Sequence, residues 1–241
     1  MSTLSARDRI LGKLRTARGE ARTSVNAIDR AIDMHYAARH ASMSRSRSMS
    51  VSERVTAMRD ALIAAHAEVI CAGSASWPAR LADRLAETGV RRLLIDPETP
   101  EGAALTKTLP ASIETVAFNA EIEAWKRELF DTIDAGFTVA RSGIAATGTL
   151  ILEPDRGSPR TMSLVPPLHI ALVRAGSLHA DLHSAAKTER WSAGMPTNLV
   201  LISGPSKTSD IQQTLAYGAH GPRWLWVVIV TDAAETEGAA R

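Results

Sequence analysis

The chain has 241 residues, of which 45% are hydrophobic and 22% are charged, and its formal net charge is +2. These values are ordinary for a globular protein and leave room for one large α/β domain with a small appendage. The charge balance argues against a nucleic-acid or membrane surface, because such surfaces need a clustered excess of basic residues.

Cys71 is the single cysteine of the chain and lies in the apolar run EVICAG, where we expect a small buried hydrophobic residue. One cysteine excludes an internal disulfide and any four-cysteine zinc or iron–sulfur site. No stretch reaches the roughly 18 apolar residues of a membrane span, and the N-terminal stretch lacks the apolar core of a signal peptide. We therefore expect a cytoplasmic protein.

The sequence predicts two unequal parts, a helical N-terminal extension with a flexible loop over 1–50 and an α/β domain over 51–241. Residues 4–17 show helical spacing, and a polar, weakly patterned region then ends in ASMSRSRSMS (41–50), which we expect to be a solvated loop. Ser52 is the expected N-cap of a helix over 53–68.

From Ser76 onward, helix-like and strand-like segments alternate. Pro78 and Gly89 bracket a short predicted helix, and further helices are predicted at EGAALTKTL and around Trp125. Apolar, β-branched runs predict strands at 91–96, 113–118, 136–140, 147–153, 169–173, 198–202 and 224–230. Continuous apolar runs indicate strands buried on both faces, so we predict an α/β fold with a mostly parallel central sheet flanked by helices.

The first candidate corner is SGIAATGT (142–149). Gly148 permits backbone conformations that other residues avoid, and Thr147 and Thr149 place hydroxyls beside it. Such a corner can hold an anion through hydroxyls and backbone N–H groups, but a tight turn that feeds a hairpin explains it equally well. The following loop carries Arg156 and Arg160, which either clamp a carboxylate or belong to an ordinary polar loop.

The second candidate corner is ISGPSKTSDI (202–211), which we interpret as a strand, a turn and a helix that begins near Thr208–Asp210. Ser206 and Thr208 can cap that helix, and Asp210 favours its first turn, so capping alone explains them. Lys207 has no capping role. His220, between Gly218 and Gly221 at the expected helix end, has the freedom to reach into a cleft.

Metal and nucleotide sites are not predicted. His179 and His183 are four residues apart on an expected helix, but no third ligand lies near them, and His169 is either a satisfied strand histidine or a ligand. The P-loop, the nucleophile elbow and the dinucleotide-binding glycine motif are absent from the sequence.

Three motifs in this order, GIAATGTLIL, SLVPPLHIALV and ISGPSKTSDIQQTLAYGAHGPRWLWVVIV, resemble the lactate-utilisation protein C group of the LUD-domain family. The clear resemblance covers about residues 135–230. It implies an α/β fold like that of the ribose-phosphate isomerase, glucosamine-phosphate deaminase and CoA-transferase superfamily. It also implies a role in oxidation of L-lactate to pyruvate with partner subunits that carry iron–sulfur clusters. In one departure, Ala146 stands where the family usually has a glutamate, the natural general acid or base there.

Two main hypotheses follow for function. The favoured one is a subunit without cofactors of its own in a lactate-oxidation system. The alternative is a stand-alone isomerase- or CoA-transferase-like enzyme acting on a small phosphorylated or CoA-linked acid, and a carboxylate-binding regulatory protein is a third reading. Whether the chain catalyses a reaction and whether it forms a homo-oligomer stay open. In each case we expect both corners to face one cleft at the carboxyl ends of the strands, lined by these residues: Thr147, Gly148, Thr149, Ser206, Lys207, Thr208, Asp210 and His220.

Overall fold

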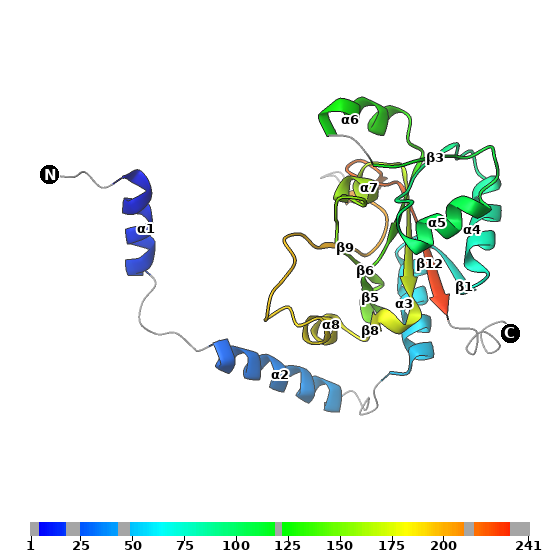
Figure 1. Cartoon of the computed structure of the whole chain (residues 1–241). Helices are drawn as coiled ribbons and strands as arrows, with labels where there is room; N and C mark the ends of the chain where they lie inside the picture. Colours follow the sequence, from blue (N-terminus) through cyan, green and yellow to red (C-terminus); the bar gives the residue numbers. More distant parts are fainter. Residues whose placement is uncertain (1–4, 18–24, 43–48, 119–121, 210–214, 232–241) are drawn as a thin grey trace. The chain divides into compact units, whose positions relative to one another are not determined.

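Two units make up the chain, Met1–Ser48 and Met49–Arg241. The computed structural model describes residues 5–17, 25–42, 49–118, 122–209 and 215–231 (Figure 1). The first unit contains α1 (Ala6–Ala17), as the spacing predicts, and α2 (Val25–Ser42), which the sequence analysis missed. Alanine-rich composition favours α2 although its apolar pattern is weak. Most of the expected loop, 43–48, lies outside the described residues.

Six parallel strands form the central sheet of the second unit, in the order β1-β12-β7-β4-β2-β3. Alternate residues of β12 pack in two different hydrophobic clusters, Val228 in one and Val227 in the other. This confirms the prediction of a mostly parallel sheet with strands buried on both faces. The bounds are β1 Glu68–Gly73, β2 Arg92–Leu94, β3 Glu114–Val116, β4 Ala135–Val139, β7 Leu168–Arg174 and β12 Trp224–Thr231.

Helices cover both faces of this sheet (Figure 1). On one face, α4 (Trp77–Ala86) and α5 (Pro100–Thr108) pack through leucines such as Leu81 and Leu105. On the other face lie α3 (Val51–Ala64) and a second, smaller sheet. Near β2, α6 (Ile122–Asp131) and α7 (Arg160–Leu164) share a third cluster that contains Leu129 and Met162. The last described helix, α8 (Leu182–Thr188), follows β8.

The second sheet has the order β8-β5-β6-β9, with β5–β8 parallel and the other two pairs antiparallel. Its strands are β5 Ser142–Ile144, β6 Thr149–Leu152, β8 Leu178–His179 and β9 Val200–Ile202. The strands predicted at 147–153 and 198–202 therefore exist but stand outside the central sheet. Strands β5 and β8 were missed because two or three residues are too short to show a period of two.

The start of α3 differs from the sequence prediction. Ser50, and not Ser52, is the N-cap: its side chain accepts a hydrogen bond from the Glu53 N–H, and the Glu53 carboxylate accepts one from the Ser50 N–H at 2.7 Å. This reciprocal capping box satisfies two otherwise unpaired donors. The helix also ends at Ala64, so Glu68 opens β1 instead of closing the helix.

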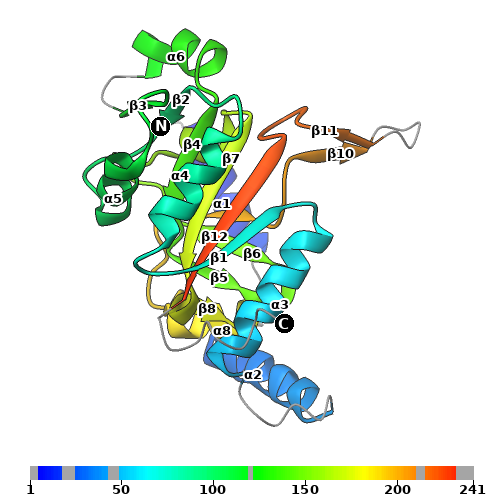
Figure 2. The ribbon, with the colours of Figure 1, turned by 90° about the vertical axis from the view of Figure 1, so that its right-hand side faces the viewer.

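The largest correction concerns residues 206–222. The predicted helix near Thr208 is wrong, because β10 (Lys207–Ser209) and β11 (Leu215–Tyr217) form an antiparallel hairpin. Figure 2 shows this hairpin extending away from the central sheet. The ring of Tyr217 contacts that of His66 at 5.8 Å between centroids, edge to face, so the hairpin packs beside the end of α3. Threonine suits a strand as well as a helix cap, so the local sequence leaves both structures open and the contact with His66 favours the strand.

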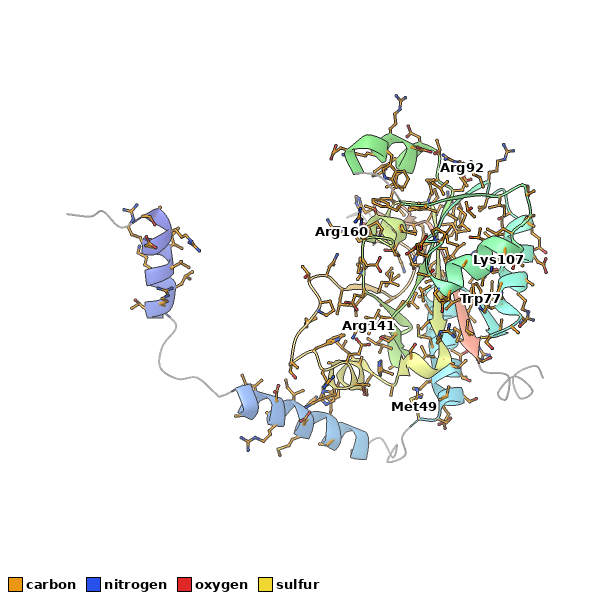
Figure 3. All side chains as sticks on the ribbon, in the orientation of Figure 1. Met49, Trp77, Arg92, Lys107, Arg141 and Arg160 are labelled. Carbon is orange, nitrogen blue, oxygen red and sulfur yellow. The ribbon has the colours of Figure 1, made fainter. Side chains whose placement is uncertain are left out.

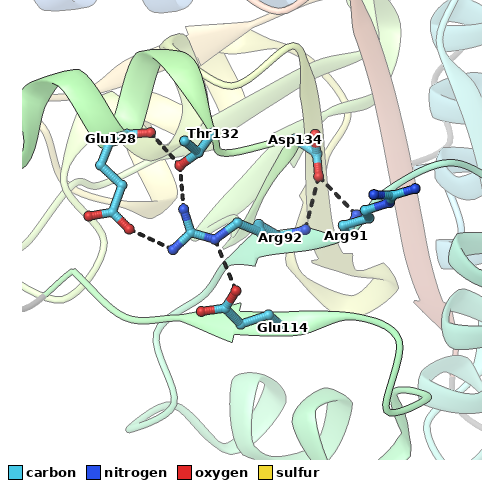
Figure 4. Close-up of polar contacts among 6 residues, drawn as sticks. All are labelled: Arg91, Arg92, Glu114, Glu128, Thr132 and Asp134. Carbon is cyan, nitrogen blue, oxygen red and sulfur yellow. Dashed lines mark hydrogen bonds and ion pairs between the residues drawn. The ribbon is translucent and has the colours of Figure 1, made fainter.

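A polar network ties the amino ends of β2, β3 and β4 to α6 (Figure 4). The Arg92 guanidinium donates to Glu114 at 3.1 Å and to Glu128 at 2.6 Å, and it also donates to the Thr132 hydroxyl. The hydrogen bonds that Arg92 donates to Glu128 and Glu114 raise its pKa. Asp134 accepts the backbone N–H of Arg92 at 2.9 Å. These contacts lie at the sheet edge opposite to the strand ends where α/β proteins bind ligands.

Candidate functional site

A cavity of about 150 Å³ opens beside the carboxyl ends of β2 and β4. The chain leaves β2 toward β3 on one side and leaves β4 toward β7 on the other, so these neighbouring strands form a topological switch point. Ligands of open α/β sheets bind in the crevice outside such a point. The lining residues are Asp96, Thr99, Phe137, Thr138, Val139, Leu152, Glu153, Pro154, Asp155, Ser158, Pro159, Arg160 and Ser163.

Three carboxylates line the cavity, and each has a partner in the protein. Asp96 accepts the Glu98 N–H at 2.9 Å, and Asp155 accepts the Ser158 N–H at 2.7 Å. Glu153, at the end of β6, pairs with Arg141. Each carboxylate keeps further lone pairs, so the cavity is rich in hydrogen-bond acceptors.

Close backbone approach shapes one wall of the cavity. A Cβ atom added to Gly157 would lie 2.2 Å from Oδ2 of Asp96, so any larger residue here would force the Asp96 carboxylate to move. Glycine at this position lets the backbone of the loop between β6 and α7 lie directly against the Asp96 carboxylate.

Arg160 is the basic residue of the lining and begins α7 (Figure 3). Its side chain makes no ion pair with any residue that the structure describes, whereas Arg141 pairs with Glu153 and, at 3.1 Å, with Glu189. An arginine without an internal carboxylate partner at a cavity suits recognition of a ligand carboxylate or phosphate.

Besides Thr99 and Ser158, two buried hydroxyl residues belong to the polar lining. Ser163, in α7, is buried, and its hydroxyl donates to the backbone carbonyl of Arg160 at 3.0 Å. Thr138, in β4, is also buried and lies 2.8 Å from Nε2 of His169 on β7. Because His169 is only 1% exposed, burial lowers the pKa of its imidazole to about 3. His169 is therefore neutral near pH 7 and bonded to a cavity residue.

The predicted corner at 147–149 forms a chain of hydroxyls. Thr147 Oγ1 lies 2.7 Å from Thr149 Oγ1, which in turn lies 2.7 Å from the Ser203 hydroxyl. Gly148 adopts φ of 61°, and an added Cβ would lie 2.9 Å from the backbone nitrogen of Leu62 in α3. The glycine thus serves close packing of the turn against α3.

The structure also joins parts of the second predicted corner. Ser206 donates its N–H to the Pro222 carbonyl at 2.8 Å and accepts the Gly218 N–H at 2.9 Å. These bonds close the base of the hairpin. Lys207 and Thr208 lie in β10, His220 is exposed in the turn after β11, and Asp210 falls outside the described residues.

Thr149 and Ser203 bring the two corners together at one point. None of the predicted site residues that the structure describes contributes to the 150 Å³ cavity. Of these lining residues, the sequence pattern indicated Arg160 as a loop arginine but did not indicate Asp96, Thr138 or Ser163. Asp96 did carry a signal, because a polar residue directly after a buried strand lies at the ligand-binding edge of a parallel sheet.

His179 and His183 do not share a helix, which corrects the prediction: His179 ends β8, and His183 lies in α8. His179 instead faces Glu189, at 3.5 Å between Nε2 and Oε1. Hydrogen bonds from Ser142 and Trp191 and the charge of Arg141 lower the pKa of Glu189, although its burial alone would raise it. Across the described residues, no group of three or more histidine, cysteine or acidic residues is arranged to hold a metal ion.

Comparison with known proteins identifies the family to which the chain belongs. Residues 55–230 match the LUD domain, which is most of the second unit. The chain belongs to the LUD-domain family. An uncharacterised protein of Neisseria meningitidis serogroup B is 38% identical over 94% of both chains.

Other relatives of this LUD-domain chain are named lactate utilization protein C. The one from Shouchella clausii is 33% identical over 44% of this chain and 47% of its own length, and the one from Deinococcus radiodurans is 36% identical over 42% and 48%. The chain thus spans about half the length of these relatives. The crystal structure of a DUF162 family protein from Deinococcus radiodurans matches with a TM-score of 0.57 and 26% identity, over 76% of this chain and 99% of that chain.

In this LUD domain, Ala146 lies exposed in the single turn η1 (Ala145–Thr147) between β5 and β6. Its N–H donates to the Ala180 carbonyl at 3.1 Å. Glu153 follows directly after the other end of β6 and lines the cavity. Carboxylates therefore line the cavity, although position 146 holds none. Within the described part of the chain, no helix has the length and apolarity to cross a membrane.

Proposed function

We propose that this LUD-domain chain serves lactate utilization as a subunit without a redox centre of its own, binding a small monocarboxylic acid in the cavity at β2 and β4. The observation that carries the proposal is Arg160, a cavity cation that makes no ion pair within the described residues. The names of its relatives give the metabolic setting.

The size of the cavity supports this ligand class. About 150 Å³ is the volume of an engineered protein cavity that binds benzene. Lactate and pyruvate each have the same number of non-hydrogen atoms as benzene. A nucleotide or a whole CoA ester is much larger, so only its acyl end would fit within the cavity.

Partner proteins supply the electron transfer in this proposal. Cys71 is the single cysteine, and an iron–sulfur cluster needs several cysteine ligands. Cys71 lies in β1, where burial raises the pKa of its thiol, so it is also poorly suited as a nucleophile. The oxidation of lactate to pyruvate releases two electrons, and we assign their transfer to iron–sulfur subunits that bind this chain.

A complementation experiment tests the proposal. Deletion of the gene is expected to abolish growth on L-lactate, and purification of the tagged chain is expected to recover iron–sulfur proteins. Arg160→Ala should fail to restore growth, while Arg156→Ala, which alters an exposed arginine of the loop before α7 and outside the cavity, should restore it. Normal growth of the deletion strain on lactate would contradict the proposal.

A stand-alone enzyme is the competing hypothesis, and the switch-point position of the cavity favours it, because the Asp96 and Glu153 carboxylates offer acid–base groups there. A thermal-shift comparison separates the two. Stabilisation by a phosphosugar or a CoA ester, with lactate and pyruvate inert, supports an isomerase- or CoA-transferase-like activity. Stabilisation by lactate without turnover in the isolated chain supports a binding or regulatory subunit.

A further inference from the structure

The hydrogen bond between His169 and Thr138 bears on what the cavity selects. His169 is buried, and its Nδ1 has no hydrogen-bond partner among the described residues. Burial lowers the pKa of the imidazole to about 3, so near pH 7 the ring carries a proton on only one nitrogen. The position of that proton decides whether Thr138 donates or accepts in the 2.8 Å bond.

The two tautomers differ in what they leave unpaired. A proton on Nδ1 would create a buried N–H donor without an acceptor, which is rare in folded proteins. A proton on Nε2 is used in the bond to Thr138 and leaves only a lone pair on Nδ1. We therefore assign the proton to Nε2. Thr138 then accepts from His169, and its own O–H is free to donate to a ligand in the cavity.

Ser163 has the opposite role. Its hydroxyl proton is committed to the Arg160 carbonyl at 3.0 Å, since a carbonyl can only accept. The Ser163 oxygen therefore presents lone pairs to the cavity and accepts from a ligand. The free carboxylate lone pairs of Asp96 and Glu153 add to these acceptors.

We propose that the cavity selects 2-hydroxy acids over 2-oxo acids, with Ser163 accepting the ligand hydroxyl and Thr138, oriented by His169, donating to the ligand together with Arg160. This inference rests on the proposed function for the size and charge of the ligand. It adds the direction of the hydrogen bonds, which the relatives' names do not give.

The expected preference for lactate over pyruvate depends on whether the oxygen on C2 of the ligand carries a hydrogen. L-Lactate has a hydroxyl that can donate to Ser163, whereas the ketone oxygen of pyruvate can only accept and would face the lone pairs of Ser163. When pyruvate binds, Ser163 must either give up its hydrogen bond to the Arg160 carbonyl and donate to the ligand, or leave its own lone pairs without a donor. Either change costs about one hydrogen bond, so we expect wild-type protein to bind L-lactate roughly three- to tenfold more tightly than pyruvate.

Calorimetric titration of the full chain with L-lactate, pyruvate and propionate tests the selectivity. Ser163→Ala should remove the preference for lactate and leave the affinity for propionate, which has no oxygen on the second carbon, unchanged. Thr138→Val should weaken all three acids, and Thr138→Ser, which retains the hydroxyl, should restore them. Equal binding of lactate and pyruvate by wild-type protein, or an unchanged preference in Ser163→Ala, overturns the inference while leaving the proposed carboxylate site standing.

Nitrogen-15 chemical shifts of the His169 ring test the donor assignment without any ligand, using Thr138→Val as the matched variant. A protonated Nε2 in the wild type supports the assignment, and a protonated Nδ1 overturns it. If none of the three acids binds, both the ligand class and the inference are wrong, whereas a failed growth test with intact binding overturns the metabolic proposal alone.

Discussion

The neutral imidazole of His169 lies 2.8 Å from the hydroxyl of Thr138 across neighbouring strands β7 and β4. Thr138 lines the candidate cavity, while His169 stands one strand further along the sheet with only 1% of its surface exposed. This pair connects the buried sheet to the ligand site, and its burial also makes the stability of the protein depend on pH.

Stability should fall with acid because of His169. Its folded pKa is about 3, below the 6.5 of an unperturbed histidine, so below pH 6.5 the unfolded chain binds a proton that the folded chain does not. The free energy of unfolding therefore loses up to about 1.4 kcal/mol per pH unit between these values and is unaffected above them. Urea unfolding at several pH values should show a shallower slope for His169→Gln than for the wild type. An identical slope in both proteins would contradict the prediction, and His220→Gln, at an exposed position, is the control.

Gly148→Ala should destabilise the protein by about 3 kcal/mol. The φ of 61° is unfavourable for alanine, and the new Cβ would meet the α3 backbone at 2.9 Å. Gly176→Ala is the matched control, because its Cβ would have no atom within 4 Å, and its effect should stay within about 0.5 kcal/mol. Chemical denaturation checks both, and similar losses in the two variants would argue against the packing explanation.

Ser50→Ala should cost about 1 kcal/mol, the usual loss of an N-cap, because the hydroxyl accepts the Glu53 N–H. Ser52→Ala removes a hydroxyl that lies inside the first turn and should leave the free energy of unfolding nearly unchanged. Thermal unfolding of both variants decides between the cap that the structure shows and the one that the sequence pattern indicates. A larger loss in Ser52→Ala would reverse the assignment.

Arg92→Ala should lower the free energy of unfolding by about 1–2 kcal/mol, since it leaves Glu114, Glu128 and Thr132 without their shared donor. Arg127→Ala, whose side chain is 96% exposed beside Asp131, should have no measurable effect. Repeating the denaturation in high salt should shrink the difference between the two variants, because screening weakens ion pairs at partly exposed sites. A difference that is unchanged by salt would indicate lost packing instead.

Local patterns in the sequence correctly predicted several strands of the central sheet and helix α4. Apolar runs such as HIALV and WLWVVIV predicted buried parallel strands, and Pro78 near a helix start and Gly89 past its end bracketed α4. Each of these signals depends only on residues that are close together in the chain, so it can be recognised from the sequence without the tertiary structure. The superfamily suggested by the resemblance stays a prediction.

The sequence by itself determined the α/β class, the mostly parallel sheet and the resemblance to the LUD-domain family. Only the tertiary structure decided that 207–209 and 215–217 pair as a hairpin, because Ser206 bonds to Pro222 and Tyr217 packs on His66, contacts that a local sequence pattern does not show. The tertiary structure also decided which residues line the candidate cavity. Asp96, Thr138 and Arg160 come from segments far apart in the chain. The first two meet because the parallel strands β2 and β4 end at one edge of the sheet, and α7 packs against β4 and brings Arg160 to the same edge.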